Sequence, residues 1–417
     1  MNREPDMTNP YGGWGCSKYM KSITLYTEEI DDLNEAMDDL VSQAEGFELE
    51  KNTLGIFFAE EELDYSELYN LLSMKWGFPI IGSTVMAMLT TDRGYCSTGM
   101  SLMILTGDDV EFSAGITEEM DIHNYKQEME KTYKELKSKL SSPEKLVLSY
   151  GGPVYTEEDV AGDLRVDELS RLSNGAYVYG ASSSDGFTFG GSRVFYNEKI
   201  VKQGQAIALI SGNIDPHFIR INSVGDKAPF QYEITKSEGN RIYKVGDISF
   251  VEALEKEGMK TGKHDVLGDY ILSPFAVTIK KENGDGVEVT RNLSVLNAET
   301  GAGSFMGNMP EGSMINIGLI NRGELKSTLA QAFTDLFEKR EKGELSYNTL
   351  ICSSCVARFM GLASNTLAEG ETFLGRLPQG VSLIGMYAYG EYCPSEGSKT
   401  GKLYNTFHNY TFSILAL

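Results

Sequence analysis

One order of elements occurs three times along this 417-residue chain, and that repetition constrains the fold more than any other feature. Each copy begins with a short β-type run and a helix whose apolar residues recur every three or four positions, which places them on one helix face. A buried-type strand, an apolar run that ends in glycine and small or hydroxyl residues, and a closing strand follow. Self-similarity of this kind decides the whole architecture. The opening strands are predicted at Ile23–Tyr26, Val110–Phe112 and Met314–Ile320, and the closing strands at Ser101–Leu105, Gln205–Ile210 and Thr411–Leu417.

We therefore predict a mixed α/β (α+β) chain of two domains, built from three β-α-β-α-β-β-like repeats with a mainly β insert before the last. Short β runs and the segment Glu282–Gly286, whose Asn-Gly and Asp-Gly pairs tolerate positive φ, indicate the insert. The predicted ranges are 23–225 for the first domain, with units at about 23–106 and 110–214, and 226–417 for the second, with the insert at 226–313 and the third unit at 314–417.

The charge balance excludes two classes of partner. Lys and Arg number 37 against 60 Asp and Glu, which gives a net charge of -23. Proteins bind nucleic acids and anionic lipid surfaces through cationic side chains. We therefore expect this protein neither to bind nucleic acid nor to insert into a membrane. Five cysteines, an odd number, do not suggest a disulfide framework. Neither a signal peptide nor an apolar run of about 20 residues is visible, so a cytoplasmic location is expected.

A glycine recurs in the third strand of each unit, as Gly82, Gly180 and Gly385. Glycine in a strand marks a bulge or a place where another backbone or a ligand comes close. Hydroxyl groups follow each glycine and supply the kind of polar contact that orients a small ligand. Two interpretations stay open: the glycines let strands cross, or they open onto a shared cavity. The hydroxyl residues are Ser83 and Thr84, then Ser182, Ser183 and Ser184, then Tyr387 and Tyr389.

The C-terminal unit carries the densest chemistry. Arg358, after a predicted strand, offers a planar fork for a carboxylate or phosphate. Glu391 offers a partner for an amine, so the two together suit a zwitterion. The alternative is that Arg358 and Glu391 pair with each other and hold two strand ends together.

The cysteines of this unit allow three interpretations. Cys352 and Cys355 have the spacing of redox or zinc motifs, but no second such pair occurs, so buried small residues are expected rather than a metal site. Cys355 as nucleophile, His408 as base and Glu391 as orienting group would suit a thiol enzyme.

Glycine-rich stretches beginning at Gly258 and Gly397 resemble the phosphate-binding loop of nucleotide-binding proteins. They have three residues, not four, between their glycines, so they do not match that pattern and no cofactor is expected.

These C-terminal segments resemble the C-terminal domain of FIST proteins, whose pattern is roughly S-C-x-x-R, G-F-Y-T-Y-G-E and a terminal H-N-x-T. The first domain resembles the N-terminal FIST domain more weakly, and the resemblance spans about residues 50–417. The matching segments are Cys352–Arg358, Leu383–Glu391 and His408–Leu417, with Ile80–Thr84 and Tyr179–Ser182 in the first domain.

The resemblance implies a sensory, signal-transduction module that binds small ligands, amino acids being the usual suggestion. Only about 22 residues precede the first predicted strand and the last strand ends at Leu417, so no output domain is expected within the sequence. A separate signalling partner, of chemoreceptor or kinase type, is expected instead.

The main hypothesis is therefore a sensor for a small metabolite, an amino acid or a similar zwitterion. Arg358 would hold its carboxylate and Glu391 its amine. Two other classes stay open: a hydrolase or transferase that uses Cys355 and His408, and an interaction module with an empty pocket. The remaining predicted ligand-binding residues are Cys355, Gly385, Tyr387, Tyr389, Gly390, His408 and Asn409.

Overall fold

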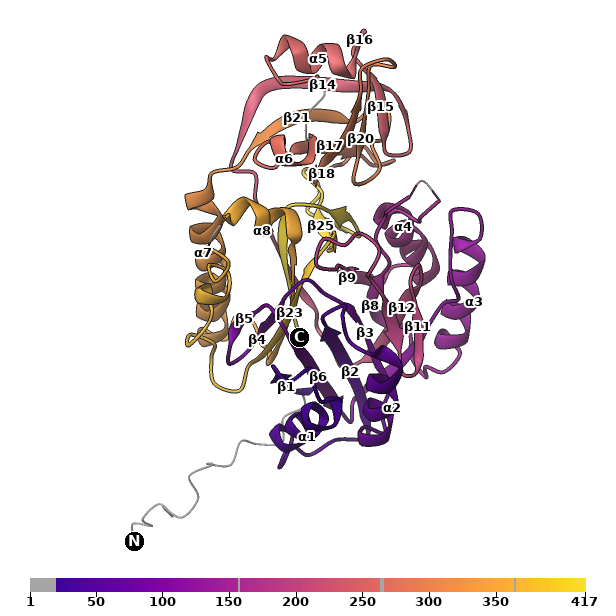
Figure 1. Cartoon of the computed structure of the whole chain (residues 1–417), viewed down its shortest axis with the longest axis vertical. Coiled ribbons are helices and arrows are strands. Elements are labelled where there is room, and N and C mark those ends of the chain that lie inside the picture. Colours follow the sequence, from indigo (N-terminus) through magenta and orange to yellow (C-terminus); the bar gives the residue numbers. More distant parts are fainter. Residues whose placement is uncertain (1–19, 157, 263–265, 364) are drawn as a thin grey trace.

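The computed structural model describes residues 20–417 except 157, 263–265 and 364. Three six-stranded sheets with helices around them form a larger body, and a smaller β-rich domain stands at one end of it (Figure 1). This mixed α/β architecture in two parts confirms the predicted fold class.

The first sheet has the strand order β1-β6-β2-β3-β10-β11, and two helices cover one of its faces. Helix α1 begins where the Asp32 carboxylate accepts hydrogen bonds from the backbone N–H groups of Asn34 and Glu35, which have no partner within the helix. The elements are β1 (Lys21–Thr27), α1 (Leu33–Gln43), β2 (Asn52–Ala59), α2 (Tyr65–Lys75), β3 (Ile80–Thr84), β6 (Met100–Gly107), β10 (Val194–Tyr196) and β11 (Lys199–Val201).

The second sheet has the order β7-β12-β8-β9-β24-β27, and the third has the order β13-β28-β22-β23-β4-β5. The second comprises β7 (Val110–Ile116), α3 (Tyr125–Lys137), β8 (Glu144–Gly151), α4 (Gly162–Ser173), β9 (Tyr177–Ser182), β12 (Gln205–Gly212), β24 (Glu391–Tyr392) and β27 (Phe407–His408). The third comprises β13 (His217–Asn222), α7 (Arg322–Glu341), β22 (Thr349–Cys355), α8 (Val356–Leu362), the 3-10 turn η1 (Gly370–Thr372), β23 (Ser382–Ala388), β28 (Thr411–Ala416), β4 (Met88–Thr90) and β5 (Gly94–Cys96).

All three sheets have one pattern of pairing. An edge strand (β1, β7 or β13) pairs antiparallel with the closing strand, which pairs antiparallel with the second strand, and the second and third strands are parallel. The last two strands of each sheet, which we call the borrowed pair, come from a different unit. The first sheet borrows β10–β11, the second borrows β24–β27 and the third borrows β4–β5.

The third sheet begins differently from the sequence-based prediction. Met314–Leu319, expected to open the third unit, is β21 and pairs with β14 and β17 of the β-rich domain. The edge position beside β28 belongs to β13 instead. The β-rich domain therefore interrupts the third unit between β13 and α7. It contains β14 (Asp226–Glu238), β15 (Arg241–Val245), β16 (Ile248–Ser249), α5 (Phe250–Lys256), α6 (Val266–Asp269), β17 (Phe275–Lys280), β18 (Gly286–Arg291), β19 (Leu293–Asn297), β20 (Ala302–Phe305) and β21, and a separate strand pair is formed by β25 (Ser395–Glu396) and β26 (Leu403–Tyr404).

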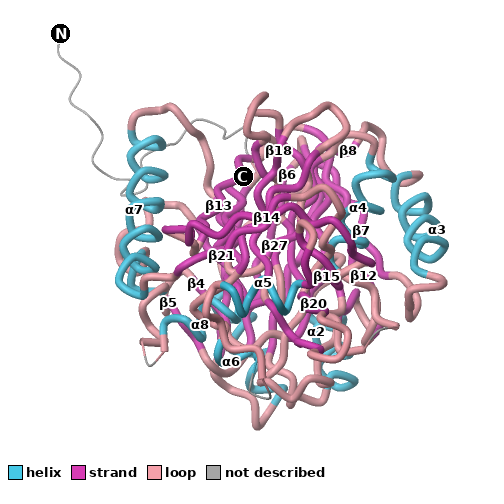
Figure 2. The backbone as a smooth tube through the Cα atoms, turned by 90° about the horizontal axis from the view of Figure 1, so that it is seen from above, coloured by secondary structure: helices cyan, strands magenta, loops and turns pink. Residues whose placement is uncertain are grey.

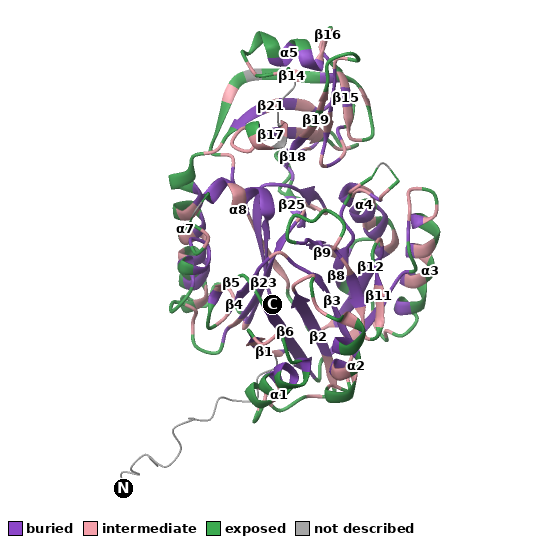
Figure 3. Ribbon diagram, in the orientation of Figure 1, coloured by how far each residue is buried: buried purple, intermediate pink, exposed green. Residues whose placement is uncertain are grey.

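The core of the larger body lies where the inner faces of the three sheets meet. Alternate residues of β2 show how one strand serves two layers, because successive side chains point to opposite faces. Ile56 and Phe58 join the central cluster with residues of the other two sheets, whereas Phe57 packs under α1 and α2. Figure 3 shows this buried centre, and Figure 2 shows α7 on one side of the strands and α3 and α4 on the other. Both faces of each sheet are thus covered.

The β-rich domain is fixed to the larger body by buried polar contacts. Arg291 donates to the Asp163 carboxylate at 2.5 Å and to the Phe407 carbonyl at 2.9 Å. The backbone N–H of Asn409 donates to the Thr290 carbonyl at 3.2 Å. The His408–Asn409 segment therefore lies at the joint between the two parts. Within the described ranges, no helix is long and apolar enough to cross a membrane.

Candidate functional site

The three strand glycines occupy equivalent places, each between the second strand of its sheet and the borrowed pair. A Cβ atom at Gly82 would lie 1.8 Å from the Phe57 carbonyl oxygen, and one at Gly180 would lie 1.8 Å from that of Ser149. These glycines let two backbones approach closely, as the packing interpretation requires. Their partners on either side are Phe57 and Phe195 for Gly82, Ser149 and Tyr392 for Gly180, and Cys352 and Leu89 for Gly385.

Except for that of Tyr387, the hydroxyl groups that follow the glycines bind other parts of the protein. The Thr84 hydroxyl donates to the Ser184 carbonyl at 2.9 Å, and the Ser184 hydroxyl donates to the Tyr387 carbonyl. All three residues are buried. These contacts connect the ends of the third strands of the three units, so this hydroxyl set joins the sheets.

Arg358 is fully buried, and protein groups already occupy its guanidinium. It donates to the carboxylate of Glu369, to the Ser223 hydroxyl at 3.0 Å and to the Leu325 carbonyl at 2.5 Å. Its ion-pair partner is therefore Glu369, not Glu391. No free fork remains for a ligand carboxylate at this position.

Glu391 and Cys355 lie together in the interior. Burial raises the pKa of the Glu391 carboxyl to about 8, against hydrogen bonds from Thr411 that favour its charged form. Burial raises the pKa of the Cys355 thiol well above its usual value, and the charge of Glu391 adds to the effect. A catalytic thiolate needs the opposite shift. The burial of Cys355 therefore argues against its role as a nucleophile.

His408 is also enclosed and makes no hydrogen bond to Cys355. Its Nε2 atom lies 2.9 Å from the Ser395 hydroxyl and 2.7 Å from that of Thr406, and its Nδ1 atom has no partner. Burial lowers the pKa of the imidazole well below its usual range, and the positive charges of Arg220 and Arg291 add to the effect. His408 is thus a neutral ring at the joint between the two parts.

The remaining predicted residues divide between interior and edge. Tyr387 and Asn409 are buried, and each has an oxygen without a hydrogen-bond partner. Tyr389 is half-buried and donates to the Asp185 carboxylate at 2.7 Å. Gly390 leaves room for a ring, because a Cβ there would lie 2.3 Å from Phe407. Cys352 is buried as well, and no group of three metal-ligating side chains occurs in the part of the chain that the structure describes.

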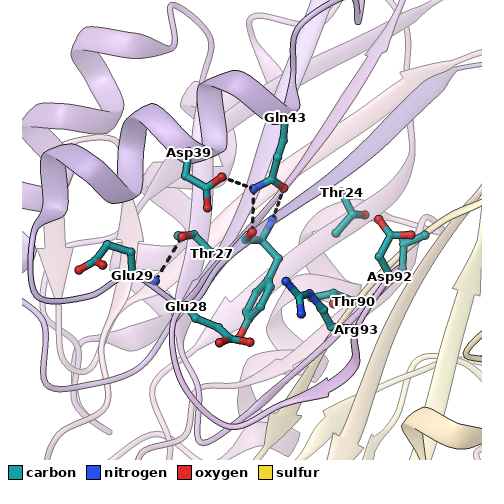
Figure 4. A pocket seen from close by; sticks show the side chains of 11 residues that line it. Thr24, Thr27, Glu28, Glu29, Asp39, Gln43, Thr90, Asp92 and Arg93 are labelled. Atoms are coloured by element: carbon teal, nitrogen blue, oxygen red, sulfur yellow. Dashed lines mark hydrogen bonds between the residues drawn. The ribbon is translucent and has the colours of Figure 1, made fainter.

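Two clefts lie at the seams between sheets. We define a seam as the contact between the borrowed pair of one sheet and the edge strand of the next. The first cleft, of about 500 Å³, lies between the β4–β5 turn of the third sheet and β1 of the first. Figure 4 shows its lining: Thr24, Tyr26, Thr27, Glu28, Glu29, Asp39, Gln43, Thr90, Thr91, Asp92 and Arg93.

Some polar groups of the first cleft form hydrogen bonds with other groups of the protein. The Gln43 amide donates to the Tyr26 carbonyl at 2.8 Å and to Asp39 at 3.0 Å, and its oxygen accepts from the Tyr26 N–H at 3.0 Å. The Glu29 carboxylate accepts from the backbone N–H of Asp31 at 2.8 Å. These contacts fix the wall that α1 and the end of β1 form.

Three charged side chains of this cleft make no such hydrogen bonds with the described residues. Glu28, Asp92 and Arg93 make no hydrogen bond or ion pair with any residue that the structure describes, and all three are exposed. Figure 4 shows Glu28 and Arg93 directed into the same space from two different sheets. One guanidinium and two carboxylates at this cleft thus have no partner among the described residues.

Sequence reasoning missed this cleft because its residues carry no motif. Asp92 and Arg93 form part of a hairpin turn, where polar residues are ordinary. The one signal was a pair of acidic residues, Glu28 and Glu29, directly after the first strand. Only the borrowed pairing of β4 with β23 brings the turn beside β1.

The comparisons with known families cover most of the chain. The FIST N domain matches residues 53–247, and the FIST C domain matches residues 256–394. The chain belongs to the FIST family. FIST domains are sensory and signal-transduction domains. The Asp92–Arg93 turn lies within the FIST N match, and His408 lies beyond the FIST C match. No curated protein matches the sequence.

Proposed function

We propose that this FIST protein is a sensor that binds a small zwitterionic metabolite, such as an amino acid, in the cleft between β1 and the β4–β5 turn. The observation that carries the proposal is that Glu28, Asp92 and Arg93 line a cleft of about 500 Å³ and form no hydrogen bond or ion pair with any described residue. A guanidinium fork binds a carboxylate through two parallel hydrogen bonds. The carboxylates of Glu28 and Asp92 provide the complementary partners for an ammonium group.

The ligand class is the one that the sequence predicts, but the site differs. Arg358 and Glu391 are enclosed, and Arg358 has its donors occupied by Glu369, Ser223 and Leu325. The seam instead offers charges of both signs that solvent and solutes reach. Binding there would link the first sheet to the third, which gives a ligand a means of changing how the two sheets sit together.

Location and partner belong to the same proposal. The four described cysteines are free and buried, which suits the reducing conditions of the cytoplasm. We place the sensor there, acting on a separate signalling protein of chemoreceptor or kinase type. The net charge of -23 favours a partner surface with basic side chains.

A thermal-shift screen against amino acids and small organic acids tests the binding. A ligand at a hundredfold excess over Kd stabilises the native state by about 2.7 kcal/mol, a shift of a few degrees for a protein of this size. We expect Arg93→Ala to abolish the shift and Lys51→Ala, an exposed charge outside the cleft, to leave it unchanged. A screen without any saturable shift, or a shift that Arg93→Ala preserves, would refute the proposed site.

A further inference from the structure

The second seam carries a cleft of different chemistry. It measures about 420 Å³ and lies between the β10–β11 turn of the first sheet and β7 of the second. Its position is equivalent to that of the first cleft, because in both the turn of a borrowed pair faces the edge strand of the next sheet. The first cleft has one aromatic lining residue, Tyr26, whereas aromatic and polar side chains together line the second.

Five aromatic side chains form the wall of the second cleft. They come from α2 and its end, from β7 and from the β10–β11 pair, so three separate elements supply them. Trp76 and Phe78 lie with ring centroids 5.7 Å apart and planes tilted by 40°. Polar groups line the rest of the cleft, and aromatic side chains with a few placed polar groups are typical of small-molecule sites of this size. The polar residues are Ser73, Ser113, Lys139, Asn197 and Glu198. The aromatic residues are Tyr69, Trp76, Phe78, Phe112 and Tyr196.

Two hydrogen-bond donors in this wall have no acceptor among the residues that the structure describes. The Tyr69 hydroxyl and the indole N–H of Trp76 are both shielded from solvent and unpartnered. Tyr69 is 1% exposed, so bulk solvent does not reach its hydroxyl. Buried polar groups are satisfied in almost all proteins, and an exception calls for a partner that the polypeptide does not itself supply.

We propose that the second seam is a binding site for a planar aromatic molecule that carries a hydrogen-bond acceptor. The rings of the wall stack against the planar face of the ligand, and its acceptor takes the hydrogen bond of the N–H of Trp76, which is half-buried. This inference goes beyond the zwitterion sensor and does not depend on it, because the two clefts share no lining residue.

A pair of matched probes tests the proposal on the full chain. Quinoline is planar and its ring nitrogen accepts a hydrogen bond, whereas indole is similar in size but its ring nitrogen donates. In ligand-observed NMR titrations we expect quinoline to bind more tightly than indole. We expect Trp76→Phe, which keeps a ring and removes the N–H, to weaken quinoline binding about threefold to tenfold, the effect of one lost hydrogen bond, and to leave indole binding nearly unchanged.

A blocking variant locates the binding. Ser73 lines the same cleft from α2 and is half-buried, so Ser73→Phe should fill the space and abolish the binding of both probes. Lys51→Ala serves as the control that retains it. Quinoline that does not bind, that binds no better than indole, or that binds Ser73→Phe with unchanged affinity would overturn the proposal. The Trp76→Phe comparison decides the role of the donor even if Ser73→Phe fails to fold.

Discussion

Arg358 and Glu369 form an ion pair in which neither side chain is exposed to solvent. Removing one member of such a pair leaves an uncompensated charge in the interior. We therefore predict that Arg358→Ala destabilises the fold by about 3–5 kcal/mol, measured by denaturant unfolding. The double variant Arg358→Met with Glu369→Leu should recover most of the loss. A soluble Arg358→Ala protein with native stability and lost ligand binding would instead restore Arg358 as a ligand-binding residue.

The buried thiol of Cys355 should be unreactive. Because burial raises its pKa well above the usual value, almost no thiolate is present at neutral pH. We predict that iodoacetamide labels this residue far more slowly in native protein than in urea-unfolded protein, with the labelled peptides identified by mass spectrometry. Fast, selective alkylation of native Cys355 near pH 7 would favour the thiol-enzyme hypothesis.

Glu391 should make stability fall as pH rises. Its pKa is about 8 in the folded protein, above the ordinary value of 4.5, so between these values the folded state holds a proton that the unfolded state releases. Stability therefore declines with increasing pH across this window. We predict that Glu391→Gln, which cannot ionise, reduces this decline when unfolding free energies at pH 5 and pH 8 are compared. An unchanged difference between the two pH values would contradict the raised pKa.

Replacing the strand glycines with alanine should destabilise the fold to different degrees. A Cβ at Gly82 or Gly180 would meet a carbonyl oxygen at 1.8 Å, whereas at Gly385 the nearest atom lies at 3.0 Å. We expect Gly82→Ala and Gly180→Ala to cost more than the roughly 1–3 kcal/mol typical of overpacking, and Gly385→Ala to cost less than either. Gly190→Ala, with nothing within 4 Å, is the control. Thermal unfolding of the four variants gives the order, and equal losses at Gly82 and Gly385 would contradict it.

The local elements were predictable because helices and strands have periodic apolar patterns. The pairing of strands from distant segments was not predictable, because the periodicity of apolar residues does not show which distant strand a segment pairs with. Met314–Leu319 has the composition of an opening strand, yet β14 and β17 compete for it, and His217–Asn222 takes its expected place. The borrowed pairs are equally invisible in sequence, since each joins a sheet of another unit.

The candidate sites show the same division. The motif residues around Arg358 and Glu391 were identifiable by residue type, but their burial was not, and burial decides whether a charged group binds a ligand or another part of the protein. The partner Glu369 belongs to no recognised motif. Arg93 and Trp76 were missed because each becomes part of a cleft only when a turn of one sheet meets an edge strand of another.

The borrowed pairs determine where the chain can be divided. A cut between Asn222 and Asp226 follows the sequence boundary of the two predicted domains, but it would leave β4, β5 and β13 without β23 and β28, and β9 without β24. Each fragment would carry unpaired strand edges, which favour aggregation. The two halves must therefore be produced and purified as one chain, so that these strands find their partners.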